Sequence, residues 1–317
     1  MKKLFLLLCM LGTIALHTSA QKKNTYLLKN NGEYVLTADS ADYFRLVEEP
    51  EKGSKLYLTK EYYIDGTRKS MGYSSRIEPP VYEGQYISYF KNGRKRQMSN
   101  YLHGKVTTDT IYNFYPNGNL YKASYRKSET DTSIYIACVK DSTGKDLVVN
   151  GNGKSITFDK DFSYITESGG MKDGVRDGVW TGQIKSDGIA YKESYDQGKL
   201  ISGECTTQDG QIYQYTQTYI PPAFKGGMKK FYNYISTSIM YPREAVMQRI
   251  QGTVIVRFTV LHDGSLSNIH SVNYANKYLA AEAIRMMKKS PKWEPGVYRG
   301  QIGNTYFDVP ISFSLSY

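Results

Sequence analysis

The chain has 317 residues, a length that predicts two or three folded units. Its 41 Lys and Arg residues outnumber its 30 Asp and Glu residues and give a formal net charge of +11. These basic residues are spread out apart from Lys91–Arg96, without RNA-binding aromatic signatures or a zinc-finger framework, so we expect a solvated basic surface and no nucleic-acid partner. Tyrosine is unusually common, at 30 residues, which favours β-structure.

The N-terminal segment has the pattern of an export signal. Lys2 and Lys3 precede an apolar run, Leu4–Leu16, and small residues at 18–20 offer a cleavage site before Gln21. The run is shorter than the roughly 20 residues that a membrane-spanning helix needs. We therefore predict that residues 1–20 are a signal peptide and that the protein is periplasmic. The alternative is an uncleaved segment that anchors the protein in the inner membrane.

Two cysteines, Cys138 and Cys205, remain after the predicted cleavage. An oxidising compartment permits a disulfide between them, and two separate thiols fit the sequence equally well. Without clustered histidines they do not form a zinc site, so we expect no metal.

Residues 21–218 are repetitive and rich in aromatic residues. The clearest copies of the repeat are Gly84–Gly93 and Tyr112–Gly118, whose Asn-Gly pairs lie 25 positions apart. Degenerate copies are found at Tyr62–Gly66 and Gly178–Lys199. An Asn-Gly or Asp-Gly pair between alternating aromatic residues predicts a β-hairpin. We therefore expect an antiparallel meander of hairpins that stack on one another through their aromatic rings, because no single hairpin buries enough surface to be stable alone.

These copies resemble MORN-type repeats, in the YwqK-like variant that many exported proteins of Bacteroidetes contain. The resemblance extends over roughly Tyr62–Lys199, and the segment 127–171 departs from it as either an insertion or degenerate repeats. Such repeats imply a scaffold or a binding surface and no chemistry.

The pattern changes after residue 218. Residues 219–225, with Pro221-Pro222, predict a stiff, extended linker. The stretch Gly252–His270 predicts a hairpin with its turn at Asp263-Gly264 and a less regular second strand that is an edge or carries a bulge. The last segment, about 304–315, alternates cleanly and predicts one more strand of the same sheet. Two helices before the hairpin and a longer one after it are predicted, with their buried faces formed by Met228, Phe231, Ile235, Ile239, Ala245, Val246, Ile250, Ala280, Ala283, Ile284 and Met287.

Several separated motifs in this region resemble the C-terminal domain of TonB-family energy transducers, in the form found in Bacteroidetes. The residues that carry the resemblance are Tyr241-Pro242, Ala245, Gly252, Asp263-Gly264, Ala283, Pro291, Trp293 and Pro295-Gly296. It extends over Pro221–Leu315, and Lys225 stands where the family pattern usually has Pro. The resemblance implies a small α+β domain at residues 226–317, in which helices cover one face of a three-stranded antiparallel sheet. The fold class we expect is therefore a mainly β repeat region followed by this domain.

The resemblance also implies a site and a partner. In the family the last strand lies at an edge of the sheet and accepts the TonB-box segment of an outer-membrane transporter as an added strand. The residues of this chain that correspond to that edge are Asn304, Thr305, Tyr306, Phe307, Asp308 and Val309. Pro310 agrees with an edge position and removes one donor, so pairing is expected in the N-terminal half of the strand. The apolar side chains of this strand are expected in the core, which leaves its backbone edge as the functional surface.

The chain departs from a full energy transducer upstream of this domain. A full energy transducer has an uncleaved transmembrane helix and a long Pro-rich spacer; we expect neither in this chain, and the repeat region takes the place of the spacer. The implied partners are TonB-dependent outer-membrane receptors or other envelope proteins, with an ExbB/ExbD-type motor only if the chain is anchored. A homodimer is also compatible with the resemblance. The alternative function is an envelope scaffold that acts through its hairpin repeats without energy transduction.

No motif in the sequence points to catalysis or to a cofactor. Among the histidines, His103, His262 and His270 remain after the predicted cleavage, and His262 and His270 fit structural positions in a turn and on a strand. A nucleophile elbow, a zinc-protease motif and a phosphate loop are all absent from the sequence. We therefore predict that the protein is not an enzyme. Trp293 is expected to anchor the packing at the end of the last helix.

Overall fold

The computed structural model describes residues 23–273 and 275–315, so the predicted signal peptide lies outside the described residues. Within these ranges, no helix is both long enough and apolar enough to cross a membrane. The chain divides into two compact units, Met1–Asp146 and Leu147–Tyr317. The domain boundary predicted near residue 218 falls inside the second unit and stays a prediction.

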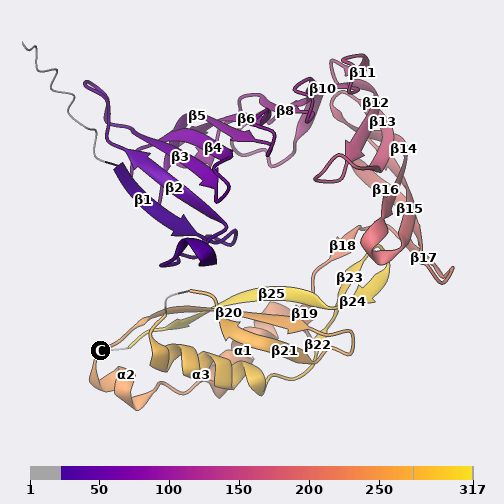
Figure 1. Cartoon of the computed structure of the whole chain (residues 1–317). Coiled ribbons are helices and arrows are strands. Elements are labelled where there is room, and N and C mark those ends of the chain that lie inside the picture. The colour runs from indigo at the N-terminus through magenta and orange to yellow at the C-terminus, as the bar shows by residue number, and fades with distance from the viewer. Residues whose placement is uncertain (1–22, 274, 316–317) are drawn as a thin grey trace, which may run out of the picture. The chain divides into compact units, whose positions relative to one another are not determined.

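The first unit is an antiparallel meander (Figure 1). Its strands pair in the order β1–β2–β3–β4–β5–β6–β8–β9–β10, and the short β7 also pairs with β6. The elements are β1 (Lys23–Leu28), a 3₁₀ turn (Ala38–Ser40), β2 (Tyr43–Glu48), β3 (Tyr57–Tyr63), β4 (Arg68–Ser74), β5 (Tyr82–Tyr89), β6 (Lys95–Leu102), β7 (Lys105–Val106), β8 (Ile111–Phe114), β9 (Leu120–Tyr125) and β10 (Tyr135–Lys140).

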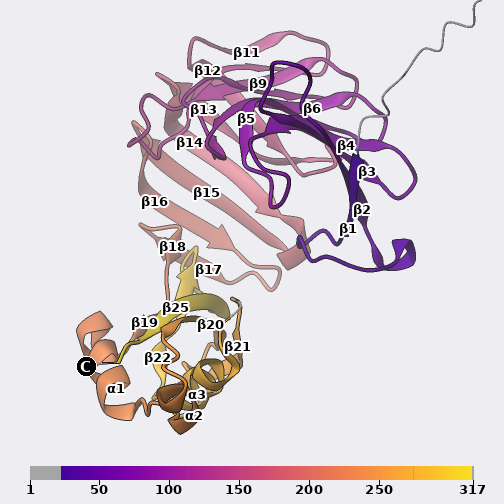
Figure 2. The same cartoon turned by 90° about the vertical axis from the view of Figure 1, so that its left-hand side faces the viewer.

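A second antiparallel run, β11 to β17, follows in the second unit, where β14, β15 and β16 lie side by side (Figure 2). Its elements are β11 (Asp146–Val149), β12 (Asn152–Phe158), β13 (Ile165–Lys172), β14 (Val175–Ile184), a 3₁₀ turn (Lys185–Asp187), β15 (Ile189–Asp196), β16 (Lys199–Thr206) and β17 (Ile212–Tyr215). The segment 127–171, which the sequence left unassigned, therefore contributes β10 to β13. The predicted meander of hairpins is confirmed in both units.

The turns form where the sequence predicts them, because Asn-Gly and Asp-Gly pairs satisfy two local requirements. Between β5 and β6, the side-chain oxygen of Asn92 accepts the backbone N–H of Arg94 at 3.0 Å. The following Gly93 has φ of 82°, a left-handed conformation that favours glycine. The pair Asn117-Gly118 repeats this arrangement between β8 and β9.

The 25-residue spacing of these pairs also has a structural reason. The side-chain amide of Asn92 donates to the carbonyl of Pro116 in the next turn, at 2.8 Å. The amide of Asn117 donates in the same way to the carbonyl of Ser142, also at 2.8 Å. Each asparagine thus shapes its own turn and ties it to the next one along the meander.

Aromatic rings pack directly over glycines of the neighbouring strand. Trp180 on β14 is the register partner of Gly169 on β13, and its ring covers the space that a side chain at position 169 would need. The indole N–H donates to the carbonyl of Gly170 at 2.8 Å. The same arrangement recurs in the register pairs Gly72–Tyr86, Gly182–Tyr191 and Gly203–Tyr215. Close approach of ring and backbone therefore explains why glycine and aromatic residues are interleaved in the sequence.

We expect Gly169→Ala to lower the free energy of unfolding by about 2 kcal/mol, as overpacking of a well-packed site does. The added methyl carbon would lie 2.2 Å from the Trp180 ring, so the ring or the strand must move. Urea unfolding measures the effect. Gly303→Ala is the matched control, because its methyl group would meet nothing within 4 Å, and an equal loss in both variants would contradict the explanation.

The remaining residues build a small α+β region in which α3 runs along one face of a three-stranded sheet (Figure 1). The order of that sheet is β21–β20–β25, all antiparallel. The elements are β18 (Tyr219–Ile220), β19 (Ala223–Phe224), α1 (Gly227–Ser238), α2 (Arg243–Met247), β20 (Gly252–Val260), β21 (Leu266–Ser271), α3 (Lys277–Lys288), β22 (Trp293–Glu294), β23 (Gly296–Tyr298), β24 (Gln301–Gly303) and β25 (Thr305–Phe313). The predicted α+β fold with a three-stranded sheet is thus confirmed.

Trp293 is the centre of the core of this region, as predicted. Its ring lies 5.1 Å from that of Phe258, 5.2 Å from that of Phe231 and 5.6 Å from those of Phe224 and Phe307, measured between centroids. Such edge-on and tilted contacts add to the burial of apolar surface. A core of this kind fixes β20 and β25 relative to the helices.

Two details of the helices differ from the sequence prediction. Met228 at the start of α1 and Val246 in α2 are both 44% exposed, although the apolar pattern placed them on buried faces. Phe231 and Ala245 are the fully buried residues of these helices. The buried stripe is therefore narrower than the pattern implied.

Residues 219–225, predicted as an extended linker, are extended but paired. Tyr219 and Ile220 form β18, which pairs with β23, and Ala223 and Phe224 form β19, which pairs with β22. The segment is thus part of the small sheets beside the core.

Candidate functional site

The candidate site is the outer edge of β25. Each residue of β25 from Thr305 to Phe313 has a register partner on β20, which lies in the middle of the three-stranded sheet. On its other side β25 pairs with no strand within residues 23–273 and 275–315. The predicted edge position of the last strand agrees with this arrangement.

The register identifies which backbone groups point outward. Ile255 on β20 directs its N–H to the side chain of Asn273 and its carbonyl to the N–H of Val272, so its backbone faces the β21 side. Its partner Pro310 must therefore direct its own backbone away from β20. The period of two extends this outward direction to Tyr306, Asp308 and Ser312. The edge thus offers three N–H donors, with Pro310 contributing only a carbonyl.

The six predicted residues form three pairs with different roles. Phe307 and Val309 point into the core, and Val309 is 2% exposed, so they support the strand. Asn304 and Thr305 stabilise its start. Tyr306 and Asp308 point outward, and Tyr306 is 71% exposed, which leaves these two as the side chains that a partner can reach.

Asn304 connects the start of β25 to the turn of the β20–β21 hairpin. Its side-chain oxygen accepts the backbone N–H of His262 at 3.0 Å. The hydroxyl of Thr305 donates to the carbonyl of Gly303 at 3.3 Å. Both contacts hold the N-terminal half of the edge in place, where strand addition is predicted.

Arg257 belongs to this site although the sequence did not single it out. It is the register partner of Asp308, and its Nε and Nη2 atoms each donate to a carboxylate oxygen at 2.8 Å. These hydrogen bonds hold the pKa of Asp308 below its ordinary value. Together with Tyr306 and Phe307, the two residues line a shallow depression at the edge. The sequence did offer one indication of this role, because Arg257 lies on the polar face of an alternating strand.

The opposite edge of the sheet is less regular. The register between β20 and β21 shifts between Arg257 and Thr259, and Asn268 within β21 has φ of 50°. A bulge of this kind bends a strand and disrupts the regular spacing of its outward groups. The bulge confirms the predicted irregularity of this hairpin. The register of β25 with β20 is unbroken, so β25 is the edge with regularly spaced backbone groups.

Histidines and acidic groups do not gather into a metal site in the part of the chain that the structure describes. His103 contacts Glu83 at 3.2 Å beside the β6–β7 turn, His262 lies in the β20–β21 turn, and His270 contacts the carbonyl of Asn268 at 2.6 Å. Cys138 and Cys205 are both free thiols.

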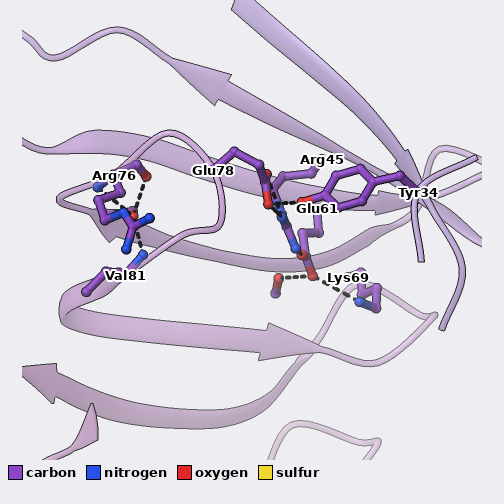
Figure 3. Close-up of polar contacts among 9 residues, drawn as sticks. Tyr34, Arg45, Glu61, Lys69, Arg76, Glu78 and Val81 are labelled. Carbon is purple, nitrogen blue, oxygen red and sulfur yellow. Dashed lines mark hydrogen bonds and ion pairs between the residues drawn. The ribbon is translucent and has the colours of Figure 1, made fainter. Parts of the chain in front are cut away.

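Two buried charge clusters were also missed by the sequence analysis. In the first unit, Arg45 binds Glu61 and Glu78, and Glu61 also binds Lys69 (Figure 3). In the second unit, Glu193 is completely buried and accepts a hydrogen bond from Arg299. All the charges in these clusters are paired, so we assign them to stability and not to a binding site.

The fold is a small α+β region whose three-stranded sheet has an open edge at β25 within the described residues. Residues 237–315 match the family described as Gram-negative bacterial TonB protein C-terminal. This confirms the resemblance for that part of the chain.

Two solved structures are similar to the same part of the chain. One is the NMR solution structure of Helicobacter pylori TonB-CTD (residues 179-285), with 28% identity over 28% of this chain and 80% of that chain and a TM-score of 0.23. The other is the structure of residues 194-285 of the same protein, with 27% identity over 27% of this chain and 90% of that chain and a TM-score of 0.22. No curated protein matches the chain.

Proposed function

We propose that the protein is a periplasmic TonB-like protein that binds extended segments of outer-membrane transporters by strand addition at β25. In this way it contributes to energy-coupled transport across the membrane. The match of residues 237–315 to the TonB C-terminal family supports the class of protein. The observation that carries the proposal is the open, regular edge with outward donors at Tyr306, Asp308 and Ser312.

Strand addition suits this edge for physical reasons. Main-chain hydrogen bonds to the outward N–H and C=O groups supply affinity, and alternate side chains supply selectivity. The core contacts of Phe307 and Val309 hold the strand rigid, which lowers the entropic cost of ordering the complex. The N-terminal half of β25 is the preferred half, because Pro310 has no N–H to donate.

In this proposal residues 1–20 direct export, and the meander over residues 21–218 acts as a MORN-like scaffold that presents the binding domain of residues 226–317. Catalysis and cofactors have no part in it. Mass spectrometry of the mature N-terminus tests the compartment: a chain that starts at Gln21 is released, and an intact N-terminus supports an inner-membrane anchor and an ExbB/ExbD-type motor.

A matched pair of variants tests strand addition. Tyr306→Ala and Tyr306→Pro both remove the ring, but only the proline removes the outward N–H. We expect the proline variant to bind a TonB-box peptide roughly fivefold more weakly than the alanine variant, since one backbone hydrogen bond contributes about 1 kcal/mol. Titration of the ¹⁵N-labelled full chain measures both affinities. Unperturbed amide signals of residues 304–309 at saturating peptide would contradict the proposal.

The second candidate is an envelope scaffold that acts through the hairpin repeats without energy transduction. It is favoured by a cavity of about 750 Å³ in the first unit, between β6, β7 and the segment after β9. Leu102, Ile134 and Arg126 are among the residues that line it, so it combines apolar surface with charge. If envelope proteins bind the Tyr306→Pro variant as well as they bind the unaltered chain, this candidate replaces the first.

A further inference from the structure

The outer face of the three-stranded sheet carries a row of polar and charged side chains that stops at the open edge. The register aligns His270 on β21, Arg257 on β20 and Asp308 on β25. The next place in this row belongs to whatever strand is added to β25. Side chains directly opposite each other on one face lie about 5 Å apart, so this place adjoins Asp308.

Asp308 can still accept hydrogen bonds from that side. Its two carboxylate oxygens each take one bond from Arg257, and a carboxylate offers about four acceptor sites. The Asp308 side chain is 41% exposed, so its free lone pairs are open to solvent and to a ligand. A cation in the next place would put the carboxylate between two positive groups, whereas an anion there would face it directly.

The neighbouring row has a different character. Thr259 on β20 pairs with Tyr306 on β25, and the Tyr306 side chain is exposed on the same outer face as Asp308. An aromatic or β-branched side chain is the favoured partner for such a ring across a strand pair. Because the side-chain period is two, this second preference applies to the ligand residue two positions from the first.

We propose that the edge of β25 selects an extended peptide with a Lys or Arg residue opposite Asp308 and an aromatic or β-branched residue two positions away, opposite Tyr306. This inference rests on the proposed strand addition and names the class of segment that the edge takes. This preference for a cation acts only at the site of contact. At long range the chain, with a net charge of +11, attracts anions.

Two nine-residue peptides test the preference. They share one alternating apolar sequence with a tyrosine and differ in a single residue, Lys or Glu, two positions from that tyrosine. We expect the full chain to bind the Lys peptide roughly tenfold more tightly than the Glu peptide, which is the sum of one favourable and one unfavourable cross-strand charge pair. Calorimetric titration at moderate salt gives both affinities.

Two variants that change the net charge equally distinguish a specific contact with Asp308 from a non-specific effect of charge. Asp308→Asn removes one negative charge and Ser312→Lys adds one positive charge, so each raises the net charge on the same face of β25 by one. We expect Asp308→Asn to reduce the Lys-to-Glu ratio to about one and Ser312→Lys to leave most of it. Arg257→Gln provides an independent measurement that keeps the carboxylate, and it should increase the ratio because Asp308 then loses the guanidinium group that binds both of its oxygens.

The outcomes distinguish this inference from the function on which it rests. Equal binding of the two peptides, or a ratio that Asp308→Asn and Ser312→Lys change alike, overturns the inference and leaves strand addition intact. Failure of both peptides to perturb the amides of Tyr306 and Asp308 overturns strand addition as well. A tenfold ratio that only Asp308→Asn abolishes supports both.

Discussion

Arg299→Ala is expected to lower the free energy of unfolding of the second unit by about 3 kcal/mol, as the loss of one partner from a buried ion pair does. Glu193 on β15 is fully buried, and the Nε atom of Arg299 donates to it at 2.9 Å. Tyr195 and Tyr215 also donate to Glu193, but they are neutral, and Arg176 is more distant at 3.7 Å. The variant would leave the carboxylate without its closest cation.

The pair also joins two parts of the second unit. Arg299 lies in the turn between β23 and β24, in the small α+β region, and Glu193 belongs to the run β11–β17. The chain has two tryptophans, and Trp180 and Trp293 report on these two parts separately. We expect the midpoints of the urea unfolding curves of the Trp180→Phe and Trp293→Phe chains to move further apart when Arg299→Ala is added to both.

An exposed pair in the same unit is the control. Lys292 contacts Asp263 at 2.9 Å, with 67% and 44% of their side chains exposed, and exposed pairs contribute about 0–1 kcal/mol. Lys292→Ala should therefore change stability little. If Arg299→Ala has no larger effect than Lys292→Ala, and the two midpoints move no further apart, the proposed role of the buried pair is wrong.

The turns could be predicted from the sequence because their causes are local. Asn92 bonds a backbone group two residues away, and the glycine after it tolerates a left-handed φ, so four residues determine the turn. The same is true of Asp263, whose side chain accepts the N–H of Ser265 at 3.0 Å. Hairpins and their connectivity follow from such turns.

Contacts between distant residues could not be predicted in this way. Glu193 and Arg299 are 106 positions apart, and no spacing rule connects a glutamate in one strand with an arginine in a remote turn. The pairing of Trp180 with Gly169 needs the register of two strands, which shifts by a bulge between Gly169 and Met171. One shifted residue changes every cross-strand pair beyond it.

The candidate site was predicted in outline for the same reason. The resemblance implied that the last strand lies at an edge, and Pro310, a local feature, agrees with that position. That Arg257 faces Asp308 depends on the register between β20 and β25, so the charged row was found only in the structure. Met228 shows a limit of local patterns as well. The spacing of apolar residues predicts which face of α1 is buried, but it does not predict that Met228, on that face, is exposed.

Arg45→Ala is expected to destabilise the first unit by about 3–5 kcal/mol, because it breaks a buried cluster (Figure 3). Arg45 donates to Glu61 at 2.9 and 3.0 Å and to both carboxylate oxygens of Glu78 at 2.9 and 3.0 Å. Lys69 would still neutralise Glu61, at 2.9 Å, but Glu78 would lose both hydrogen bonds from Arg45. Hydrogen exchange of the β2–β4 amides measures the loss in this unit.

The same variant has a defined pH dependence. Burial raises the pKa of Glu61, but the charges of Lys69 and Arg45 and the hydroxyl of Ser70 outweigh burial and hold that pKa below its ordinary value. A carboxylate of this kind adds stability above its unfolded pKa, about 4.3, and loses it as the pH falls through the folded pKa. Without Arg45 the lowering is smaller. The deficit of the variant should therefore be largest near pH 7 and shrink below about pH 4.

Lys140→Ala provides the comparison in the first unit, since its contact with Asp146 is partly exposed to solvent and should contribute much less to stability. A deficit for Arg45→Ala that stays constant from pH 7 to pH 3 would mean that lost packing, and not the charge of Glu61 and Glu78, explains the effect. Arg45→Met separates these terms further, because it keeps most of the side-chain volume and removes only the guanidinium. Equal losses in the alanine and methionine variants would identify the ion pairs as the source of the stability.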